Sequence, residues 1–253
     1  MEQTHRDRRL ETLLQNALDD GKDVWAVGDI HGCKSAFEEL LATLRLSEGD
    51  QVVCLGDLID RGPDSQGVLQ IVRDGKNIHS LKGNHEAIMS RALRDPSSRK
   101  MDFWLRVGGR ETLESMDSDI TNRLGKASEW MAFTDSLPSE VVLDAFRLVH
   151  AGYDVDLPLE GQSDKERLSS RSVFLAKTPL DPERQIICGH TPVQKLGDFG
   201  LSTVEEGVWF SDVRLTDGRP STVLVDTGAV LKSGVNRPRL SAYSLSTGQV
   251  LDV

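Results

Sequence analysis

The sequence predicts an α/β fold built in layers, with a helical segment inserted near its middle. Short apolar runs of strand length alternate with segments whose apolar residues recur at helical spacing, and this alternation is typical of layered α/β domains. Several of these runs also pass directly into polar loops that contain glycine. Ligand sites in open α/β sheets gather at the carboxyl ends of strands, so these loops are the places to look for a site.

The first half of the chain carries three strand-to-loop units separated by helices. Residues 1–22 have apolar side chains on one side, so we expect a solvated helix that stops near Gly21. The segments 24–32, 51–65 and 77–86 each begin with an apolar run and predict a buried strand followed by a loop. Apolar residues at helical spacing predict helices over 34–46 and near 68–72.

The second half begins with a change of character. Trp, Leu and Met residues recur at helical intervals over 86–137, which predicts a mostly helical insert. Two strands with a turn at Asp144-Ala145 are expected next, then a polar loop over 154–170. The remaining expected elements are a strand-to-loop unit at 185–192, a strand within 221–230, and a hairpin over 239–253 that turns at 246–248. Without a repeat or a convincing linker, residues 1–253 are interpreted as one domain.

Composition excludes several classes of protein. The 253 residues include 30 basic and 40 acidic side chains, a formal net charge of −10, and 38% are apolar, which is enough for a real core. We find no membrane-spanning run, no signal peptide and no CxxC spacing among three cysteines, so we expect a cytoplasmic protein without a disulfide framework. The acidic balance argues against sequence-blind nucleic-acid binding. An anionic substrate would therefore need local positive charge, such as metal ions.

Four of the six histidines lie in the loops after strands, close to acids and an amide. The set comprises Asp29, His31, Asp57, Asp60, Asn84, His85, His150 and His190. Imidazole, carboxylate and amide ligands without thiolate suit Mn, Fe or Zn. Asp29 and His31 can face one ion from a single loop, and the two oxygens of Asp57 can bridge to a second ion. Two cations ~3.5–4 Å apart form a clamp for in-line displacement at phosphorus.

The motifs, in their order along the chain, resemble those of the calcineurin-like metallophosphoesterases, in particular the small bacterial and phage form of the phosphoprotein phosphatase branch. They are GDIHG (28–32), GDLIDRG (56–62), GNHE (83–86), HAG (150–152) and GHTP (189–192). The resemblance implies a four-layer α/β/β/α sandwich with a helical insert and two divalent metal ions, manganese being expected and iron or zinc the alternatives. It implies Asp29, His31 and Asp57 as ligands of the first metal, and Asp57, Asn84, His150 and His190 as ligands of the second.

The same resemblance implies roles for the side chains that meet the substrate. Arg61 and Asn84 would bind the phosphate, and His85, oriented by Asp60, would be the general acid for the leaving oxygen. The nucleophile would be a metal-bound hydroxide that attacks directly, with no covalent phosphoenzyme.

A second phosphate-binding arginine is expected shortly before the GHTP loop. The segment SSRSVFL (169–175) resembles the family's pattern there and places Arg171 in the position of that arginine. Ser169 replaces the usual Trp, so Arg167 is a competing candidate.

Other residues near the motifs are interpreted as structural. Trp104 is expected in the core of the insert, Asp64 at the start of a helix, and residues 226–230 in a closing strand. The Gly108-Gly109 pair is expected to shape a rim beside the pocket.

The expected function is hydrolysis of phosphoserine or phosphothreonine in proteins, with phosphotyrosine as a further substrate. The alternative is a symmetrical dinucleoside tetraphosphate hydrolase or another nucleotide pyrophosphohydrolase, because such relatives share the motifs. A non-catalytic metal-binding module is less expected, since His85, Asp60 and Arg61 are all present, and a phosphodiesterase is disfavoured by the net charge. The partner is thus a phosphoprotein, a small phosphoester or a nucleotide, not nucleic acid or a membrane, and the sequence assigns no oligomeric state.

Overall fold

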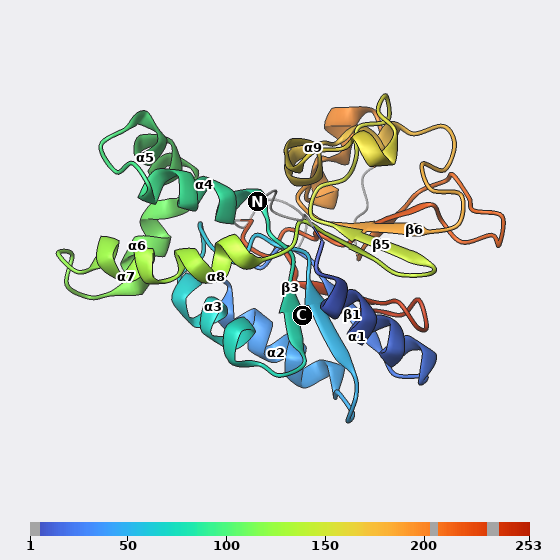
Figure 1. Ribbon diagram of the computed structural model, residues 1–253, viewed down its shortest axis with the longest axis horizontal. Coiled ribbons are helices and arrows are strands. Elements are labelled where there is room, and N and C mark those ends of the chain that lie inside the picture. The colour runs from blue at the N-terminus through green and yellow to red at the C-terminus, as the bar shows by residue number, and fades with distance from the viewer. Residues whose placement is uncertain (1–5, 203–206, 232–237) are drawn as a thin grey trace.

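Two five-stranded sheets form the centre of the computed structural model, which describes residues 6–202, 207–231 and 238–253 (Figure 1). The first sheet has the strand order β10-β9-β1-β2-β3 and the second has the order β4-β5-β6-β8-β7. The first comprises β1 (Val24–Val27), β2 (Gln51–Cys54), β3 (Ile78–Ser80), β9 (Ser241–Ser244) and β10 (Val250–Asp252). The second comprises β4 (Glu140–Val142), β5 (Phe146–Val149), β6 (Gln185–Cys188), β7 (Trp209–Phe210) and β8 (Thr222–Leu224).

The directions of the strands determine where the loops that form the site lie. Strands β1, β2 and β3 run parallel, as do β5, β6 and β8, whereas the C-terminal hairpin of β9 and β10 joins β1 antiparallel. The carboxyl ends of the parallel strands within each sheet therefore lie at one edge. The expected hairpin over 239–253 is confirmed, and so is the strand pair that turns at Asp144-Ala145.

Helices cover the outer faces, and this gives the expected four layers. The helices are α1 (Arg8–Asp19), α2 (Lys34–Leu44), α3 (Ser65–Asp74), α4 (Asn84–Leu93), α5 (Arg99–Trp104), α6 (Arg110–Met116), α7 (Arg123–Glu129), α8 (Met131–Ser136) and α9 (Asp164–Ser169). Short 3₁₀ helices cover Leu159–Gly161, Ser172–Leu175 and Val193–Phe199. A π-helical turn covers Leu105–Gly109. The α/β fold class is confirmed.

Apolar residues on alternating sides of the strands build the layers. In β1, Ala26 packs in the cluster between the two sheets, whereas Val27 joins Phe37 of α2 on the outer side. In β6, Ile187 faces the first sheet and Ile186 faces the outer cluster of the second. Because successive side chains of a strand point to opposite faces, strands buried on both faces read as continuous apolar runs.

The helical segment over 86–137 is confirmed, with helices from Asn84 to Ser136 (left in Figure 1). Trp104, Met116 and Trp130 share one hydrophobic cluster with the α2 side of the first sheet. The insert therefore packs directly on the layer that carries the first three strand-to-loop units.

The expected loop over 154–170 is wrong in part, because α9 begins at Asp164 after a capping box. The hydroxyl of Ser163 accepts from the N–H of Lys165, and the Glu166 carboxylate accepts from the N–H of Ser163. The spacing S-x-x-E is a helix-start signal that was present in the sequence. Strand β7 and the 3₁₀ segments were not predicted either.

No helix in the described ranges combines the length and the apolar character that crossing a bilayer requires. Helix α1 confirms the expected N-terminal helix for its described part, and residues 1–5 lie outside the described residues.

Candidate metal centre and active site

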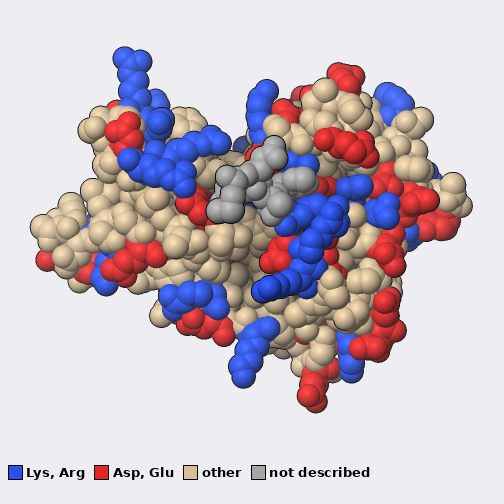
Figure 2. Space-filling view, viewed as in Figure 1, with Lys and Arg blue, Asp and Glu red and all other residues tan. Residues whose placement is uncertain are grey.

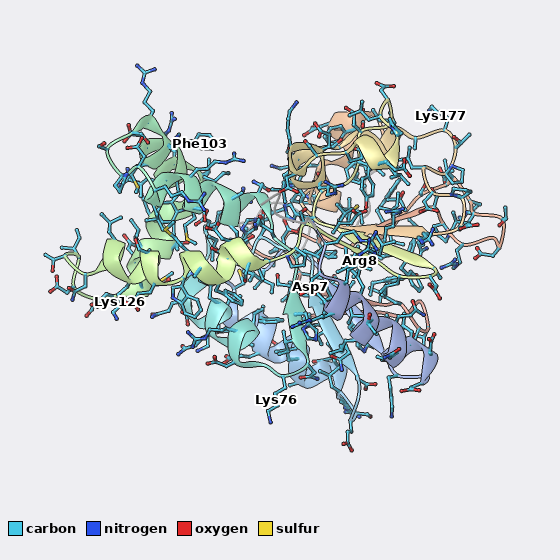
Figure 3. The ribbon with its side chains drawn as sticks, viewed as in Figure 1. Asp7, Arg8, Lys76, Phe103, Lys126 and Lys177 are labelled. Carbon is cyan, nitrogen blue, oxygen red and sulfur yellow. The ribbon has the colours of Figure 1, made fainter. Side chains whose placement is uncertain are left out.

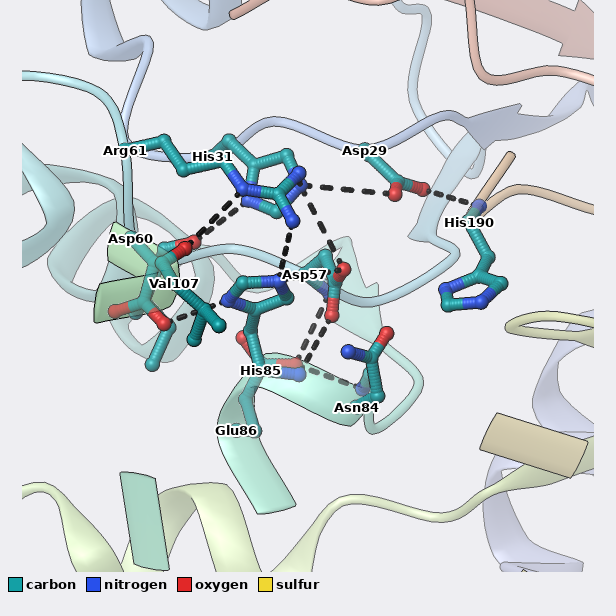
Figure 4. A network of polar contacts seen from close by, with 12 residues as sticks. Asp29, His31, Asp57, Asp60, Arg61, Asn84, His85, Glu86, Val107 and His190 are labelled. Carbon is teal, nitrogen blue, oxygen red and sulfur yellow. Dashed lines mark hydrogen bonds and ion pairs between the residues drawn. The ribbon is translucent and has the colours of Figure 1, made fainter. Parts of the chain in front are cut away.

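The loops that follow five strands converge on one place, and Figure 4 shows labelled residues from the loops after β1, β2, β3 and β6. They supply Asp29 and His31 after β1, Asp57, Asp60 and Arg61 after β2, Asn84 and His85 after β3, His150 after β5, and His190 after β6. Positive φ angles occur at His31 (47°), Asp57 (51°), Asp60 (74°), Arg61 (71°) and His190 (69°). Non-glycine residues rarely adopt this conformation, and such strain concentrates at functional sites.

One group of side chains surrounds Oδ2 of Asp57. This oxygen lies 3.6 Å from Nε2 of His31 and 3.9 Å from Nε2 of His85, and Oδ2 of Asp29 lies 3.9 Å from the same His31 nitrogen. The ligand atoms of His31, Asp57 and His85 all lie within 4.8 Å of one another. This group could hold one metal ion.

A second group surrounds the other oxygen of Asp57. Oδ1 lies 3.5 Å from Nε2 of His150, and Oδ1 of Asn84 lies 2.9 Å from that nitrogen. Asp57, His150 and His190 also place their ligand atoms within 4.8 Å of one another. The two carboxylate oxygens of Asp57 thus face two separate groups, which is the arrangement that a bridging ligand requires.

His31 and His150 point Nε2 toward the centre, and burial favours the neutral form of these two rings and of His190. Nδ1 of His31 lies 2.8 Å from the carbonyl oxygen of Ile59, and Nδ1 of His150 lies 2.9 Å from that of Leu55. Burial lowers the pKa of His31 to about 3 and also lowers the pKa of His150 and His190. Nε2 of His190 is buried without a hydrogen-bond partner, which costs ~1–3 kcal/mol unless a ligand bond forms. Neutral imidazoles oriented through their other nitrogen are typical metal ligands.

Buried carboxylates add a charge that calls for cations. Burial and the nearby charges of Asp226 and Asp57 hold the pKa of Asp29 well above its usual range. Burial, with Asp57 adding to it, raises the pKa of Asp226 to about 7. Like charges buried together are unfavourable unless a bound cation compensates them. The donor set therefore fits a pair of divalent ions with oxygen and nitrogen ligands.

His85 and Asp60 form a buried pair beside these groups. Nδ1 of His85 lies 2.6 Å from Oδ2 of Asp60. Burial lowers the pKa of His85, but Asp57 and Asp60 outweigh it, and the net result is a raised pKa. The pair therefore favours the protonated form of the imidazole, and Nε2 of the ring faces the site.

The helical insert holds Asp60 in place. Nε1 of Trp104 donates to both carboxylate oxygens of Asp60 at 3.0 and 3.1 Å, and Oγ1 of Thr112 donates to Oδ1 at 2.6 Å. Trp104, Thr112 and Asp60 are all fully buried. Trp104 is a core residue, as expected, but it also has this polar contact, which its position in the sequence did not indicate.

Arg61 extends over both histidines of the first group (Figure 4). Its Nη1 lies 2.7 Å from Nε2 of His31, and its Nη2 lies 2.8 Å from Nε2 of His85. The N–H of Arg61 donates to the carbonyl of Gly108, and a Cβ at Gly108 would lie 2.6 Å from that nitrogen. With φ at +128°, only glycine fits there, and this supports the expected role of the glycine pair beside the pocket.

Arg171 and Arg61 both line a cavity of about 390 Å³. Nε of Arg171 donates to Oγ1 of Thr191 at 3.0 Å. Arg167, the competing candidate, is instead buried against Glu140, with 3.3 Å between Nε and Oε2. The structure therefore places Arg171, and not Arg167, at the site. The cavity is also lined by His31, Asp57, Asn84, His85, His190, Asp226, Ile88, Phe103 and Phe199.

Two further acids belong to the site and were missed. Asp226 was interpreted as structural within a closing strand, but β8 ends at Leu224 and Asp226 lines the cavity. Its signal was available, since an acid follows an apolar run here as in the other loops. Glu86 is buried and accepts hydrogen bonds from the N–H groups of Asp57, Leu58 and Gly83, at 3.0, 2.8 and 2.7 Å. It fixes the two loops to each other. Asp64, in contrast, caps α3 as expected.

Comparisons with known proteins identify the family of the chain. The calcineurin-like phosphoesterase family matches residues 22–224. The chain is 30% identical over 186 residues to serine/threonine-protein phosphatase 1 of Salmonella typhimurium, covering 70% of this chain and 82% of that protein. It is 44% identical over 81 residues to a symmetrical bis(5'-nucleosyl)-tetraphosphatase of Acidovorax, but this covers only 30% of this chain and 29% of that protein.

The fold agrees as well. A protein serine/threonine phosphatase from Saccharomyces cerevisiae superposes with a TM-score of 0.55 at 13% identity, covering 97% of this chain and 88% of that one. Given the family match over most of its length, the chain belongs to the calcineurin-like phosphoesterases, in the branch of the bacterial serine/threonine protein phosphatases.

Proposed function

We propose that this phosphoesterase is a metal-dependent phosphoprotein phosphatase that hydrolyses phosphoserine and phosphothreonine monoesters, and phosphotyrosine as a further substrate. One observation carries the proposal: Arg61, Arg171 and His85 line the same cavity as side chains from both groups that could hold a metal ion. A phosphate oxyanion and a leaving oxygen both need partners, and these residues offer them within one cavity. The longer of the two similarities, over 70% of the chain, is to a protein phosphatase.

Residues of both sheets would hold the metal ions. Asp29, His31 and Asp57 would hold the first, and Asp57 with Asn84, His150 and His190 the second, with manganese expected and iron or zinc as alternatives. When bound, such ions supply Lewis acidity toward the phosphoryl oxygens and toward the nucleophilic water.

The chain's own side chains would do the rest. The guanidinium groups of Arg61 and Arg171 bind phosphate oxygens, for which a planar fork of donors is suited, and Asn84 adds its amide. His85 gives its proton to the leaving oxygen, because Asp60 and Asp57 favour the protonated ring. Asp60 holds that ring in one orientation and is itself held by the insert.

A second candidate is symmetrical hydrolysis of dinucleoside tetraphosphates. It is supported by the 44% identity to a tetraphosphatase over 81 residues, which is higher than the identity to the phosphatase but far shorter. The same arginines and histidines would serve that reaction, so the substrate has to be decided by assay.

The deciding experiment measures kcat/KM side by side on phosphoserine, phosphothreonine and phosphotyrosine peptides and on diadenosine tetraphosphate, with added manganese. We expect the phosphoserine and phosphothreonine peptides to be preferred. Strong preference for the dinucleotide would establish the second candidate instead. His85→Asn should lower kcat on the preferred substrate by ~10²–10⁴, the usual contribution of general acid–base catalysis. Turnover at the wild-type level by a metal-loaded variant would refute the acid role.

A further inference from the structure

A second cavity of about 370 Å³ adjoins the catalytic one on the surface of the insert. Its lining is formed by Ile88, Arg91, Arg99, Lys100 and Phe103. Ile88 and Phe103 also line the catalytic cavity, so the two spaces share a wall. Phe103 is 46% exposed, and Figure 3 shows it on the insert.

Helical spacing explains why these side chains share one surface. Ile88 and Arg91 are three residues apart on α4, and Lys100 and Phe103 are three apart on α5, so each pair lies on one side of its helix. The two helices thereby combine an apolar wall with a rim of cations. We call the surface formed by these five residues the α4–α5 subsite.

The charge of the subsite is opposite to that of the whole chain. Arg91, Arg99 and Lys100 are exposed, and none of them forms an ion pair with any residue that the structure describes. Arg94 lies nearby but is not part of the subsite lining, and it is paired with Asp135. Figure 2 shows blue side chains gathered over the ends of α4 and α5. In a protein of net charge −10, three adjacent unpaired cations form a local attraction for anions.

We propose that the α4–α5 subsite binds an acidic segment next to the phosphorylated residue of a protein substrate, an inference that rests on the proposed phosphatase function. The phosphorylated side chain lies between Arg61 and Arg171, and the flanking acidic residues reach the rim of Arg91, Arg99 and Lys100. The shared wall of Ile88 and Phe103 accommodates apolar parts of the peptide between the two positions.

The donor chemistry suits an anionic occupant, and the proposed phosphatase function makes that occupant an acidic peptide rather than the far half of a dinucleotide. Arginine and lysine side chains only donate hydrogen bonds, and they supply all the polar side chains of the subsite. Carboxylates accept from such donors without competition. The amino group of an adenine would find no side-chain acceptor in the subsite, whereas the polyphosphate of a dinucleotide would pair with the same cations, so diadenosine tetraphosphate is the competing substrate in the test.

The test compares two phosphoserine peptides that differ only in their flanking residues, one with aspartates and one with asparagines. Three exposed ion pairs predict a wild-type preference for the acidic peptide on the order of tenfold in kcat/KM. Replacing the cations together, Arg91→Gln, Arg99→Gln and Lys100→Gln, should reduce this ratio to nearly one. Because both peptides are assayed with the same preparation, the ratio does not depend on the active fraction of the enzyme.

A matched control removes the same charge elsewhere. Arg9, Lys76 and Lys177 are exposed cations outside the lining of both cavities, and Figure 3 shows that Lys76 and Lys177 lie on other parts of the molecule. Their joint replacement by glutamine should leave the ratio near the wild-type value. Equal loss of preference in this control would overturn the subsite in favour of a general charge effect.

Salt gives a second measurement that needs no variant. Raising the ionic strength from about 0.05 to 0.5 M shortens the screening length, so the wild-type ratio should fall toward one. Hydrolysis of both peptides at equal rates in low salt would refute the subsite while leaving the phosphatase function intact. Hydrolysis of diadenosine tetraphosphate with no turnover of either peptide would refute the phosphatase function, and the subsite with it.

Discussion

Replacing Thr112 by valine tests how the insert supports the His85–Asp60 pair, for which we propose the general-acid role. The two side chains have nearly the same shape, so the change removes one hydroxyl that donates to Oδ1 of Asp60 at 2.6 Å. Both residues are fully buried, so water has no access to replace the bond. The Thr112 hydroxyl also accepts from the N–H of Asp60 at 2.9 Å and lies 3.0 Å from Oγ of Ser65. After the change the N–H of Asp60 keeps Oγ of Ser65 at 3.0 Å as its acceptor, but the Ser65 hydroxyl loses a partner.

The largest part of the expected cost comes from the bond to the charged Asp60 oxygen, and the lost contact with Ser65 adds to it. A hydrogen bond to a charged group contributes ~1.5–3 kcal/mol, so the loss of the Asp60 bond alone should cost about 2 kcal/mol in the free energy of unfolding. For a chain of this size that corresponds to a decrease in Tm of roughly 4–8 °C. If all of it reached the transition state through His85, kcat would fall by at most ~30-fold. Trp104 still holds both oxygens of Asp60, so the loss should be smaller than for His85→Asn.

The assay combines urea unfolding with steady-state kinetics on a phosphopeptide. Thr134→Val is the matched control, because Thr134 is fully buried in the same insert but contacts only carbonyls of Trp130 and Met131. It should leave kcat near the wild-type value. The reasoning would be refuted if Thr112→Val did not change stability. It would also be refuted if its effect on kcat persisted undiminished in a His85→Asn background.

The remaining predictions concern the metal groups, the rim and the second sheet. Asp57→Asn should weaken both metal ions together, since its two oxygens face both groups, and elemental analysis that finds only one ion lost would contradict this. Gly108→Ala should lower kcat/KM and stability, because the new Cβ would lie 2.6 Å from the backbone nitrogen of Arg61, and unchanged kinetics would exclude that contact. Burial raises the pKa of Glu140, but a hydrogen bond from Tyr153 and two nearby arginines lower it by a larger amount. The net pKa of Glu140 is therefore depressed. The stabilisation is then present above the unfolded pKa and is lost as pH falls through the lower folded value. Glu140→Gln should accordingly flatten the fall in unfolding free energy below about pH 4.5, and urea titrations that give identical acid limbs would oppose this.

Local patterns were sufficient for the elements that build the layers. Apolar runs such as 24–27 and 51–54 are short and continuous, and the helical spacing over 34–46 was unambiguous. The structure accordingly has the predicted strands and the predicted helix in these segments. The short helix α9 was missed because its six residues bury little apolar surface and its start depends on a cap. Strand β7 has only two residues, and pairing with β8 rather than its own pattern defines it.

The sequence by itself determined the chemistry of the site, because each motif is a short loop that directly follows its own strand. Histidine, aspartate and asparagine at those places already indicate metal ions and phosphate, whatever the distances. Only the tertiary structure decided that Arg171 rather than Arg167 reaches the cavity, that Asp226 belongs to it, and that Trp104 holds Asp60. Those contacts join residues far apart in the chain, and their existence depends on how the two sheets and the insert pack against one another.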